Sequence, residues 1–435
     1  MKTRLWCLAV TYCLGAVIFA RADDWPQWRG PDRNDISKET GLLKSWPKDG
    51  PKLLWKFKDA GAGFSSPSIV GDRLYCMGGD GNNDFVFALD IKDKGKKIWS
   101  KQVGPFFKNN NADGPRSEPA VDGDFLYVLT AQGELICLET KNGEKKWQIS
   151  LKQDLGGQLM SGWGYSESPL VDGDKVICTP GGSKGTMAAV DKKTGKLLWE
   201  SKEISDKAAY SSVVPMTVGG IHQYVQMTGN SVFGVAADDG RLLWRVERSG
   251  PVAAVPTPVV HDNYVYVTSG YDAQCTLIKL TPDGKTIKAE KVYSNKNMEN
   301  QHGGVVLVDG HIFGHWGSNP ERPHRWVCQD LLTGEVTWEE KKKGDPGTSK
   351  LEKGSITYAD GHLYLFSEKT GTAVLLEAST KGWKEDGRFT IPHESKVRNK
   401  GRIWTHPVVA DGRLFLRDQD VLFCYDIKAS TSTKR

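Results

Sequence analysis

The chain has 435 residues, of which 38% are hydrophobic and 10% aromatic, so it has enough apolar side chains for a large core. Its 48 Gly and 20 Pro make up about one residue in six, which indicates many turns but excludes a collagen-like or low-complexity chain. The formal net charge of +5 falls to about +2 without residues 1–22, which hold Lys2, Arg4 and Arg21 and no acid, so bulk charge excludes a general nucleic-acid binder.

Residues 1–22 have the three parts of a secretory signal peptide. A positive start is followed by an apolar run over residues 5–19, and Ala20 and Ala22 are the small residues before the expected cleavage site. The run is shorter than the roughly 20 residues that a membrane-spanning helix needs. We therefore expect an exported, soluble protein, periplasmic or secreted, with no integral membrane segment after cleavage. A retained signal anchor is the alternative.

Three further regions follow the signal peptide. Residues 23–50 are expected to form an extended leader, which includes the sequence DWPQWRGP at residues 24–31. Residues 51–430 hold a repeated pattern. The short polar tail of residues 431–435 is expected to be disordered.

A turn followed by an alternating strand recurs eight times, with a period of about 48 residues. Residues 122–127, with the sequence DGDFLY, show the pattern most clearly. Asp-Gly and related pairs supply the positive φ angles of a tight hairpin turn. The eight turns lie at residues 70–72, 122–124, 172–174, 218–220, 261–263, 309–311, 360–362 and 411–413.

In most repeats the turn is followed by an acid, then a glycine four residues later, and then a tryptophan four residues after the glycine. Glu139, Gly143 and Trp147 show this ending, whereas the fifth repeat has Lys288 in place of the Trp and the seventh, around Trp383, is degenerate. The Gly fits a turn position with positive φ, and the Trp offers a large apolar face to a neighbouring repeat. The predicted structural docking residues are Trp55, Trp99, Trp147, Trp199, Trp244 and Trp338.

Each repeat has the length and turn spacing of four short antiparallel strands, which is typical of a propeller blade. The eighth repeat ends after residues 423–426 without its fourth strand, and a matching strand lies at residues 53–57, near the other end of the chain. Pairing these two segments removes the exposed sheet edges. The sequence therefore predicts an all-β, eight-bladed β-propeller of four-stranded antiparallel blades, closed by the N-terminal strand. Seven blades are the alternative.

Cysteine and histidine positions favour neither disulfides nor a metal site. Cys137, Cys328 and Cys424 occupy equivalent places in separate repeats, so they cannot meet, and we interpret them as small buried thiols. His311 and His315 lie on one face of a predicted strand, but no Cys or carboxylate stands at ligand spacing. We expect no metal ion.

The repeats resemble those of the quinoprotein-type (PQQ-like) β-propeller family. The Gly-x3-Trp ending is similar to the tryptophan-docking motif of that family, and the resemblance covers about residues 50–430. The family includes quinone-dependent alcohol dehydrogenases and a non-catalytic scaffold of the outer-membrane protein assembly machinery. The dehydrogenases use an adjacent Cys pair, a Ca²⁺ held by Glu, Asn and Asp, and an Asp base. This chain has no adjacent Cys pair, so it resembles the scaffold more.

Three long loops that lead into predicted inner strands are rich in aromatic and charged residues: 106–119, 156–167 and 398–406. Such loops converge on one mouth of a propeller channel, where ligands usually bind. Arginines there would bind anionic groups, glutamates hydroxyls and tryptophans flat apolar faces. Alternatively, these charged residues hold the blades in register. The predicted mouth residues are Arg116, Glu118, Trp163, Tyr165, Glu167, Tyr210, His302, Arg402, Trp404 and His406.

No H-E-x-x-H, G-x-S-x-G or P-loop sequence is present, and no catalytic residue is assigned. The first hypothesis is an exported, non-enzymatic scaffold or binding module without a cofactor, which engages an envelope protein or a carbohydrate at one mouth of the channel. The alternative is a pyrroloquinoline-quinone-dependent alcohol or sugar dehydrogenase with Ca²⁺. The sequence leaves the ligand, the channel face and the oligomeric state open.

Overall fold

The computed structural model describes residues 24–109, 112–250, 252–317, 324–340, 351–398 and 402–430. The predicted signal peptide, the predicted disordered tail and parts of the first and third mouth loops lie outside these residues. All named elements in the described ranges are β-strands, which confirms the all-β prediction. Nowhere in those ranges is there a helix with the length and apolar character to cross a membrane.

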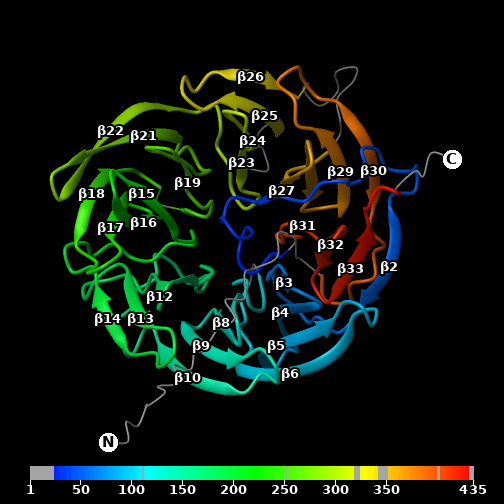
Figure 1. The fold of residues 1–435 in the computed structure, drawn as a ribbon, viewed down its shortest axis with the longest axis horizontal. Helices are drawn as coiled ribbons and strands as arrows, with labels where there is room; N and C mark the ends of the chain where they lie inside the picture. The colour runs from blue at the N-terminus through cyan, green and yellow to red at the C-terminus, as the bar shows by residue number, and fades with distance from the viewer. Residues whose placement is uncertain are drawn as a thin grey trace, which may run out of the picture.

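The strands form eight sheets, each with four antiparallel strands, arranged as blades around one axis (Figure 1). This confirms eight blades and excludes seven. Blades 1 to 4 are β3 (Ser68–Val70), β4 (Arg73–Gly79), β5 (Asn83–Asp90), β6 (Lys96–Pro105); β7 (Ala120–Asp122), β8 (Phe125–Leu129), β9 (Glu134–Glu139), β10 (Lys145–Ser150); β11 (Leu170–Asp172), β12 (Lys175–Cys178), β13 (Ala188–Asp191), β14 (Leu197–Glu200); and β15 (Val214–Val218), β16 (Ile221–Met227), β17 (Ser231–Ala236), β18 (Leu242–Glu247). Blades 5 to 8 are β19 (Val259–His261), β20 (Tyr264–Thr268), β21 (Cys275–Asp283), β22 (Thr286–Asn295); β23 (Val305–Val308), β24 (His311–Trp316), β25 (Arg325–Asp330), β26 (Val336–Glu339); β27 (Gly354–Ala359), β28 (His362–Ser367), β29 (Thr372–Glu377), β30 (Glu385–Thr390); and β31 (Val408–Ala410), β32 (Arg413–Asp418), β33 (Val421–Asp426), β2 (Lys52–Phe57).

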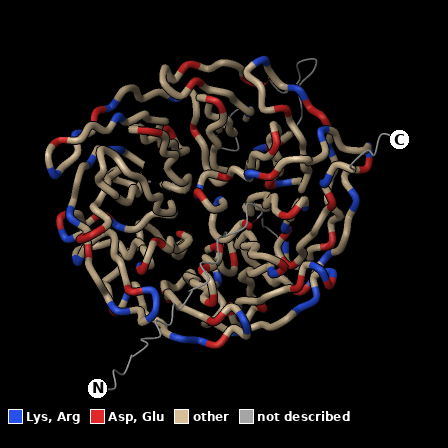
Figure 2. Tube along the Cα trace, in the orientation of Figure 1, with Lys and Arg blue, Asp and Glu red and all other residues tan. Residues whose placement is uncertain are grey.

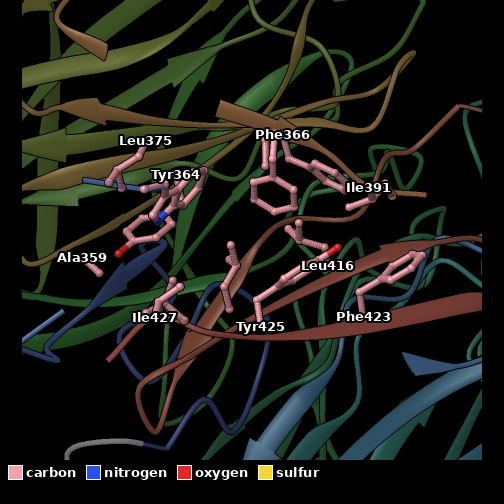
Figure 3. Packing of buried hydrophobic residues seen from close by; sticks show 14 of the residues in the cluster. Ala359, Tyr364, Phe366, Leu375, Ile391, Leu416, Phe423, Tyr425 and Ile427 are labelled. Carbon is pink, nitrogen blue, oxygen red and sulfur yellow. The ribbon is translucent and has the colours of Figure 1, made fainter. Parts of the chain in front are cut away.

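The N-terminal strand completes the eighth blade. β2 pairs antiparallel with β33, with Leu53 opposite Tyr425 and Trp55 opposite Cys424. The first strand that belongs to a blade, β2, thus lies beside the last strand of the chain, β33 (Figure 1). Apolar side chains from blades 7 and 8, among them Phe366 and Phe423, pack in one buried cluster beside this closure (Figure 3). The ring closure predicted from the repeats is confirmed.

Docking tryptophans join four pairs of consecutive blades. A methyl group added to Gly143 would lie 2.7 Å from Cε3 of Trp99, so the Trp ring lies directly on a glycine of the next blade. The adjoining β-bulge places Trp147 opposite Cys137, and this pattern is repeated in other blades. The four Trp–Gly pairs are Trp55–Gly95, Trp99–Gly143, Trp147–Gly195 and Trp199–Gly240. Trp244 is also buried, and Trp338 packs edge-on against Trp383.

The fifth blade docks through a tyrosine, which corrects the expectation that Lys288 stands at the Trp position. The β21–β22 hairpin is longer than its counterparts, so Tyr293 lies opposite Leu277 beside the bulge. The Tyr293 ring packs on Gly334 of the sixth blade. Its hydroxyl donates to Leu331 O at 2.8 Å, much as Trp99 Nε1 donates to a carbonyl of the next blade.

The leader is an integral part of the ring rather than a separate extended segment. Its Trp25 backbone pairs with Ile69 of blade 1, and the chain then crosses the centre of the molecule (Figure 1). β1 (Ile36–Ser37) joins β27 as a parallel strand. Trp46 packs over Gly387, which occupies the register position of the missing docking Trp of blade 7.

The six cysteines in the described ranges are buried and free, as predicted. Figure 2 shows Lys and Arg interspersed with Asp and Glu around the ring. The tube view therefore shows no sector of the ring that carries charges of one sign only.

Candidate functional site

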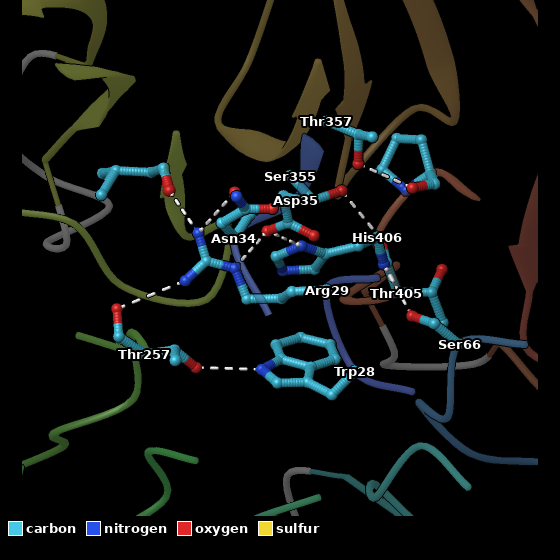
Figure 4. Close-up of polar contacts among 12 residues, drawn as sticks. Trp28, Arg29, Asn34, Asp35, Ser66, Thr257, Ser355, Thr357, Thr405 and His406 are labelled. Atoms are coloured by element: carbon cyan, nitrogen blue, oxygen red, sulfur yellow. Dashed lines mark hydrogen bonds and ion pairs between the residues drawn. The ribbon is translucent and has the colours of Figure 1, made fainter. Parts of the chain in front are cut away.

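The leader fills the centre of the channel with buried polar groups. Arg29 Nε donates to Asp35 Oδ2 at 2.6 Å, and Arg29 Nη2 donates to Val305 O of blade 6 at 2.6 Å. Asp35 Oδ2 also lies 3.0 Å from His406 Nδ1 in the loop before blade 8 (Figure 4). Trp28 Nε1 donates to Thr257 Oγ1 in the loop before blade 5 at 2.9 Å. One short segment thus ties together the inner ends of several blades.

Arg33 makes the corresponding contacts with blade 3. Its Nη2 donates to Ser168 O at 2.9 Å and its Nη1 to Pro169 O at 3.1 Å. Burial lowers the pKa of Arg33 to about 10, and the nearby Glu167 and Glu118 partly offset that effect. These contacts belong to the structural interpretation, in which charged groups near the axis hold the blades in register.

Three predicted mouth residues lie in the interior and do not line the mouth. Glu167 accepts hydrogen bonds from Thr179 N at 2.7 Å and Thr179 Oγ1 at 3.0 Å, and burial raises its pKa to about 8. Glu118 accepts from Ser68 Oγ at 3.3 Å, and burial raises its pKa well above the ordinary value. Tyr165 is a core residue whose hydroxyl donates to Pro180 O. All three side chains are buried and are not among the residues that line the mouth cavity.

The other seven predicted mouth residues line one cavity of about 440 Å³. Residues of the leader and of further inner loops, which the sequence reasoning missed, complete its wall. The predicted residues in the wall are Arg116, Trp163, Tyr210, His302, Arg402, Trp404 and His406, and the missed ones include Trp28, Arg29, Phe64, Tyr271 and Gln301. The aromatic content of the DWPQWRGP segment was the one signal that could have pointed to Trp28.

Aromatic rings form two walls of this mouth cavity. His302 and Trp404 stack with their centroids 4.0 Å apart and their planes 12° apart. The ring centroid of Phe64 lies 4.7 Å from that of Trp404. In a second aromatic pair of the wall, the ring centroids of Trp163 and Tyr210 lie 5.8 Å apart. The Tyr210 hydroxyl forms a hydrogen bond with the Ser161 hydroxyl. The cavity therefore presents flat apolar surfaces to a ligand.

The charged groups of the mouth are mainly cations. Arg402 Nη1 and Lys353 Nζ each lie 3.2 Å from the same Glu368 oxygen, Oε1. Burial, together with these two cations, lowers the pKa of His302 to about 3, so this imidazole is neutral at pH 7. Arg116 Nη1 donates to Gly114 O at 2.6 Å, and burial lowers the pKa of its guanidinium to about 10.

No Asp or Glu lines the cavity within the described part of the chain, whereas three arginines do. Ca²⁺ binds six to eight oxygen ligands, with carboxylates prominent among them. Glu118 and Glu167 are already committed to interior hydrogen bonds. Groups of three or more His, Cys, Asp or Glu suited to a metal ion are also absent from the described ranges. The mouth therefore fits an anionic group with an apolar ring and does not fit the Ca²⁺ of a quinoprotein dehydrogenase.

The blades, their docking turns and the closing strand together define a β-propeller with quinoprotein-type repeats. The family model described as "Outer membrane protein assembly factor BamB" matches residues 88–340 and 212–376, which together cover about two thirds of the chain. The chain belongs to this family.

The curated relatives include both a member of this family and an enzyme. Outer membrane protein assembly factor BamB of Moranella endobia is 26% identical over 362 residues, covering 76% of this chain and 84% of that protein. Tetrathionate hydrolase of Acidithiobacillus ferrooxidans is 27% identical over 279 residues, but the match covers only 51% of that enzyme and 60% of this chain.

Two solved structures share the fold at low sequence identity. BamB from Moraxella catarrhalis gives a TM-score of 0.58 at 15% identity, covering 86% of this chain and 97% of that one. Quinohemoprotein alcohol dehydrogenase from Comamonas testosteroni gives a TM-score of 0.62 at 11% identity, covering 96% of this chain and 82% of that one. At these identities the likeness concerns the fold alone, and scaffolds and dehydrogenases share it.

Proposed function

We propose that this chain is an exported, non-enzymatic scaffold of the cell envelope that captures a protein partner at the mouth cavity. The observation that carries the proposal is the composition of the cavity wall: aromatic rings and arginines, with no acid among its described residues. Tryptophan, tyrosine and arginine are the residues that contribute most to protein–protein binding. The family assignment supports a role in assembly at the outer membrane.

The proposal does not extend to a carbohydrate ligand. The two glutamates expected to bind sugar hydroxyls, Glu118 and Glu167, lie in the interior at 1% and 2% exposure. Sugar recognition would therefore rest on aromatic stacking, without carboxylates that accept hydrogen bonds from the sugar hydroxyl groups.

Capture from the native envelope fraction tests the proposal. The wild-type chain and the variants Trp163→Ala and Arg402→Gln are used as bait, and the bound proteins are identified by mass spectrometry. Arg241→Gln is the control, because Arg241 pairs with Asp238 and Asp239 in an exposed turn of blade 4. We expect a defined partner to be lost with both mouth variants and retained with the control. Equal capture by all four proteins would reject the mouth as the binding site.

Quinone-dependent oxidation of an alcohol or sugar is the competing function, and the shared fold is the observation in its favour. The residues at the mouth do not fit its Ca²⁺, as described above. Addition of pyrroloquinoline quinone and Ca²⁺ to the purified chain, followed by dye reduction with alcohols and sugars, separates the two functions. We expect neither dye reduction nor a change in the quinone spectrum, and substrate-dependent reduction would favour the dehydrogenase.

A further inference from the structure

We infer that the mouth cavity recognises a carboxylate next to an aromatic ring, presented by an acidic segment of the partner protein. This inference rests on the proposed function, because it names the chemistry of the segment that the scaffold captures. It is argued from the charges, the ring geometry and the hollow that adjoins the cavity.

The charges around the cavity leave an excess of positive charge. Arg29 is neutralised by Asp35 at 2.6 Å. Arg402 and Lys353 share the single carboxylate of Glu368, so among the described residues one positive charge there has no counter-ion of its own. The Arg402 side chain is 43% exposed, which lets it reach a ligand.

Arg116 adds a second cation to the lining of the cavity. Its two terminal nitrogens donate to carbonyl oxygens, Gly114 O and Ala112 O, and not to a carboxylate. The acid with the largest effect on Arg116 is Asp84, and burial raises the pKa of Asp84 to about 7, so its charge is only partial at neutral pH. A carboxylate in the cavity would therefore have the guanidinium groups of Arg116 and Arg402 in the surrounding wall, and guanidinium groups bind carboxylates well.

The aromatic rings of the cavity wall favour a ligand that carries an aromatic ring next to its carboxylate. The stacked pair of His302 and Trp404 and the pair of Trp163 and Tyr210 both line the cavity. A volume of about 440 Å³ suits one aromatic side chain with its neighbouring acid. Aromatic pairs contribute to binding beyond the burial of their area, so a ring in this space adds to affinity.

The cavity adjoins a second, larger hollow, called here the groove, and this neighbourhood favours a protein segment over a free acid. Phe64, Asn109 and Ala112 line both the cavity and a second hollow of about 1110 Å³, which is formed by residues of blades 8 and 1. Lysines such as Lys58 and acids such as Asp420 both line the groove, so it accommodates a polypeptide without selecting its charge. A free acid would occupy the cavity alone and would make no use of the groove.

Binding of short peptides to the mature chain tests the inference. The probe is an end-blocked, fluorescein-labelled peptide, Gly-Glu-Phe-Glu-Gly, compared with Gly-Gln-Phe-Gln-Gly and Gly-Glu-Ala-Glu-Gly by fluorescence anisotropy. We expect each comparison peptide to bind about tenfold more weakly, because each loses one of the two recognised groups. Affinity should also fall as salt rises.

The variants Arg116→Gln and Arg402→Gln should each weaken the Glu-Phe-Glu peptide about tenfold, whereas Arg241→Gln should bind as the wild type does. Thermal unfolding confirms that each variant is folded. Equal binding of the Glu and Gln peptides would overturn carboxylate recognition. Competition by naphthalene dicarboxylate at the affinity of the peptide would overturn the assignment to a protein segment.

The two proposals fail in different ways. Loss of partner capture in the mouth variants, without discrimination among the peptides, would overturn this inference and leave the scaffold function standing. Capture unaffected by the mouth variants would overturn the scaffold site itself, whatever the peptides do.

Discussion

Tyr293 replaces the docking tryptophan in blade 5. Its ring and its hydroxyl make the two contacts with the next blade that the ring and the indole N–H of a docking tryptophan make elsewhere. Its ring covers Gly334 and its hydroxyl reaches Leu331 O. We expect Tyr293→Ala to lower the free energy of unfolding by about 3 kcal/mol, because a large ring and a hydrogen bond are lost together. Tyr293→Phe should cost only about 1 kcal/mol, the hydrogen bond alone.

Urea unfolding followed by tryptophan fluorescence measures both changes. A Tyr293→Ala loss no larger than that of Tyr293→Phe would contradict the docking role of the ring.

Two glycines of blade 2 separate the cost of backbone strain from the cost of a lost docking contact. Gly143 has φ of 71° and bears the Trp99 ring, whereas Gly123 has φ of 57° and would place a methyl group in open space. Positive φ costs a non-glycine residue about 1–2 kcal/mol at either position. We expect Gly143→Ala to cost at least about 1 kcal/mol more than Gly123→Ala, because its methyl group must displace the Trp99 ring.

The comparison is made from the urea midpoints of the two variants. Equal losses would mean that the Trp99 ring adjusts freely and does not depend on a bare glycine.

Among the elements, the leader contributes most beyond the repeats. Trp46 is 7% exposed, and its ring centroid lies 5.3 Å from that of Phe389. It covers Gly387, at the position where blade 7 has no docking Trp of its own. We expect Trp46→Ala to lower the free energy of unfolding by about 3–5 kcal/mol, as for other buried aromatic residues. Lys48→Ala, an exposed change in the same segment, should leave it within about 0.5 kcal/mol of the wild type.

Calorimetric unfolding of the two variants measures the difference. If the two melted alike, the leader would be dispensable for blade 7.

The three mouth loops show what sequence patterns determine at this scale. Their richness in aromatic and charged residues predicted that they meet, and Arg116, Trp163 and Arg402 do line one cavity. The same pattern could not show that Tyr165 and Glu167 turn inward. Loops lack the strict alternation of strands, so the direction of a loop side chain depends on its neighbours in space.

At the scale of the whole molecule, the buried acids at the centre make stability depend on pH. The pKa of Glu167 rises from 4.5 to about 8 on folding, so between these values the folded protein keeps a proton that the unfolded chain has lost. This contribution to stability is fully present below 4.5 and is lost as the pH rises through about 8. Glu118 acts in the same direction.

We therefore expect the melting temperature of the wild type to fall between pH 5 and pH 8, and Glu167→Gln to reduce that fall. The amide keeps a neutral group at this position without a proton to lose. Glu144→Gln, which changes an exposed acid of blade 2, is the control and should leave the slope unchanged. A slope in Glu167→Gln equal to that of the wild type would contradict the assignment.

The sequence alone determined the eight blades, the strand that closes the ring and the family resemblance. These features follow from local signals, Asp-Gly turns and Gly-x3-Trp endings, which each repeat carries within its own 48 or so residues. The Lys288 expectation was wrong because a longer β21–β22 hairpin moves the docking position to Tyr293, and spacing alone cannot measure a hairpin.

Only the tertiary structure decided the path of the leader and the composition of the mouth. The leader has no repeat and no periodicity, and its contacts join residues far apart in the chain: Arg29 and Thr257 are separated by 228 positions and Asp35 and His406 by 371. Such pairs form because closing the ring leaves buried carbonyls and carboxylates at the axis that must find hydrogen-bond partners. That requirement exists only in the closed ring, so no local pattern in the sequence encodes it.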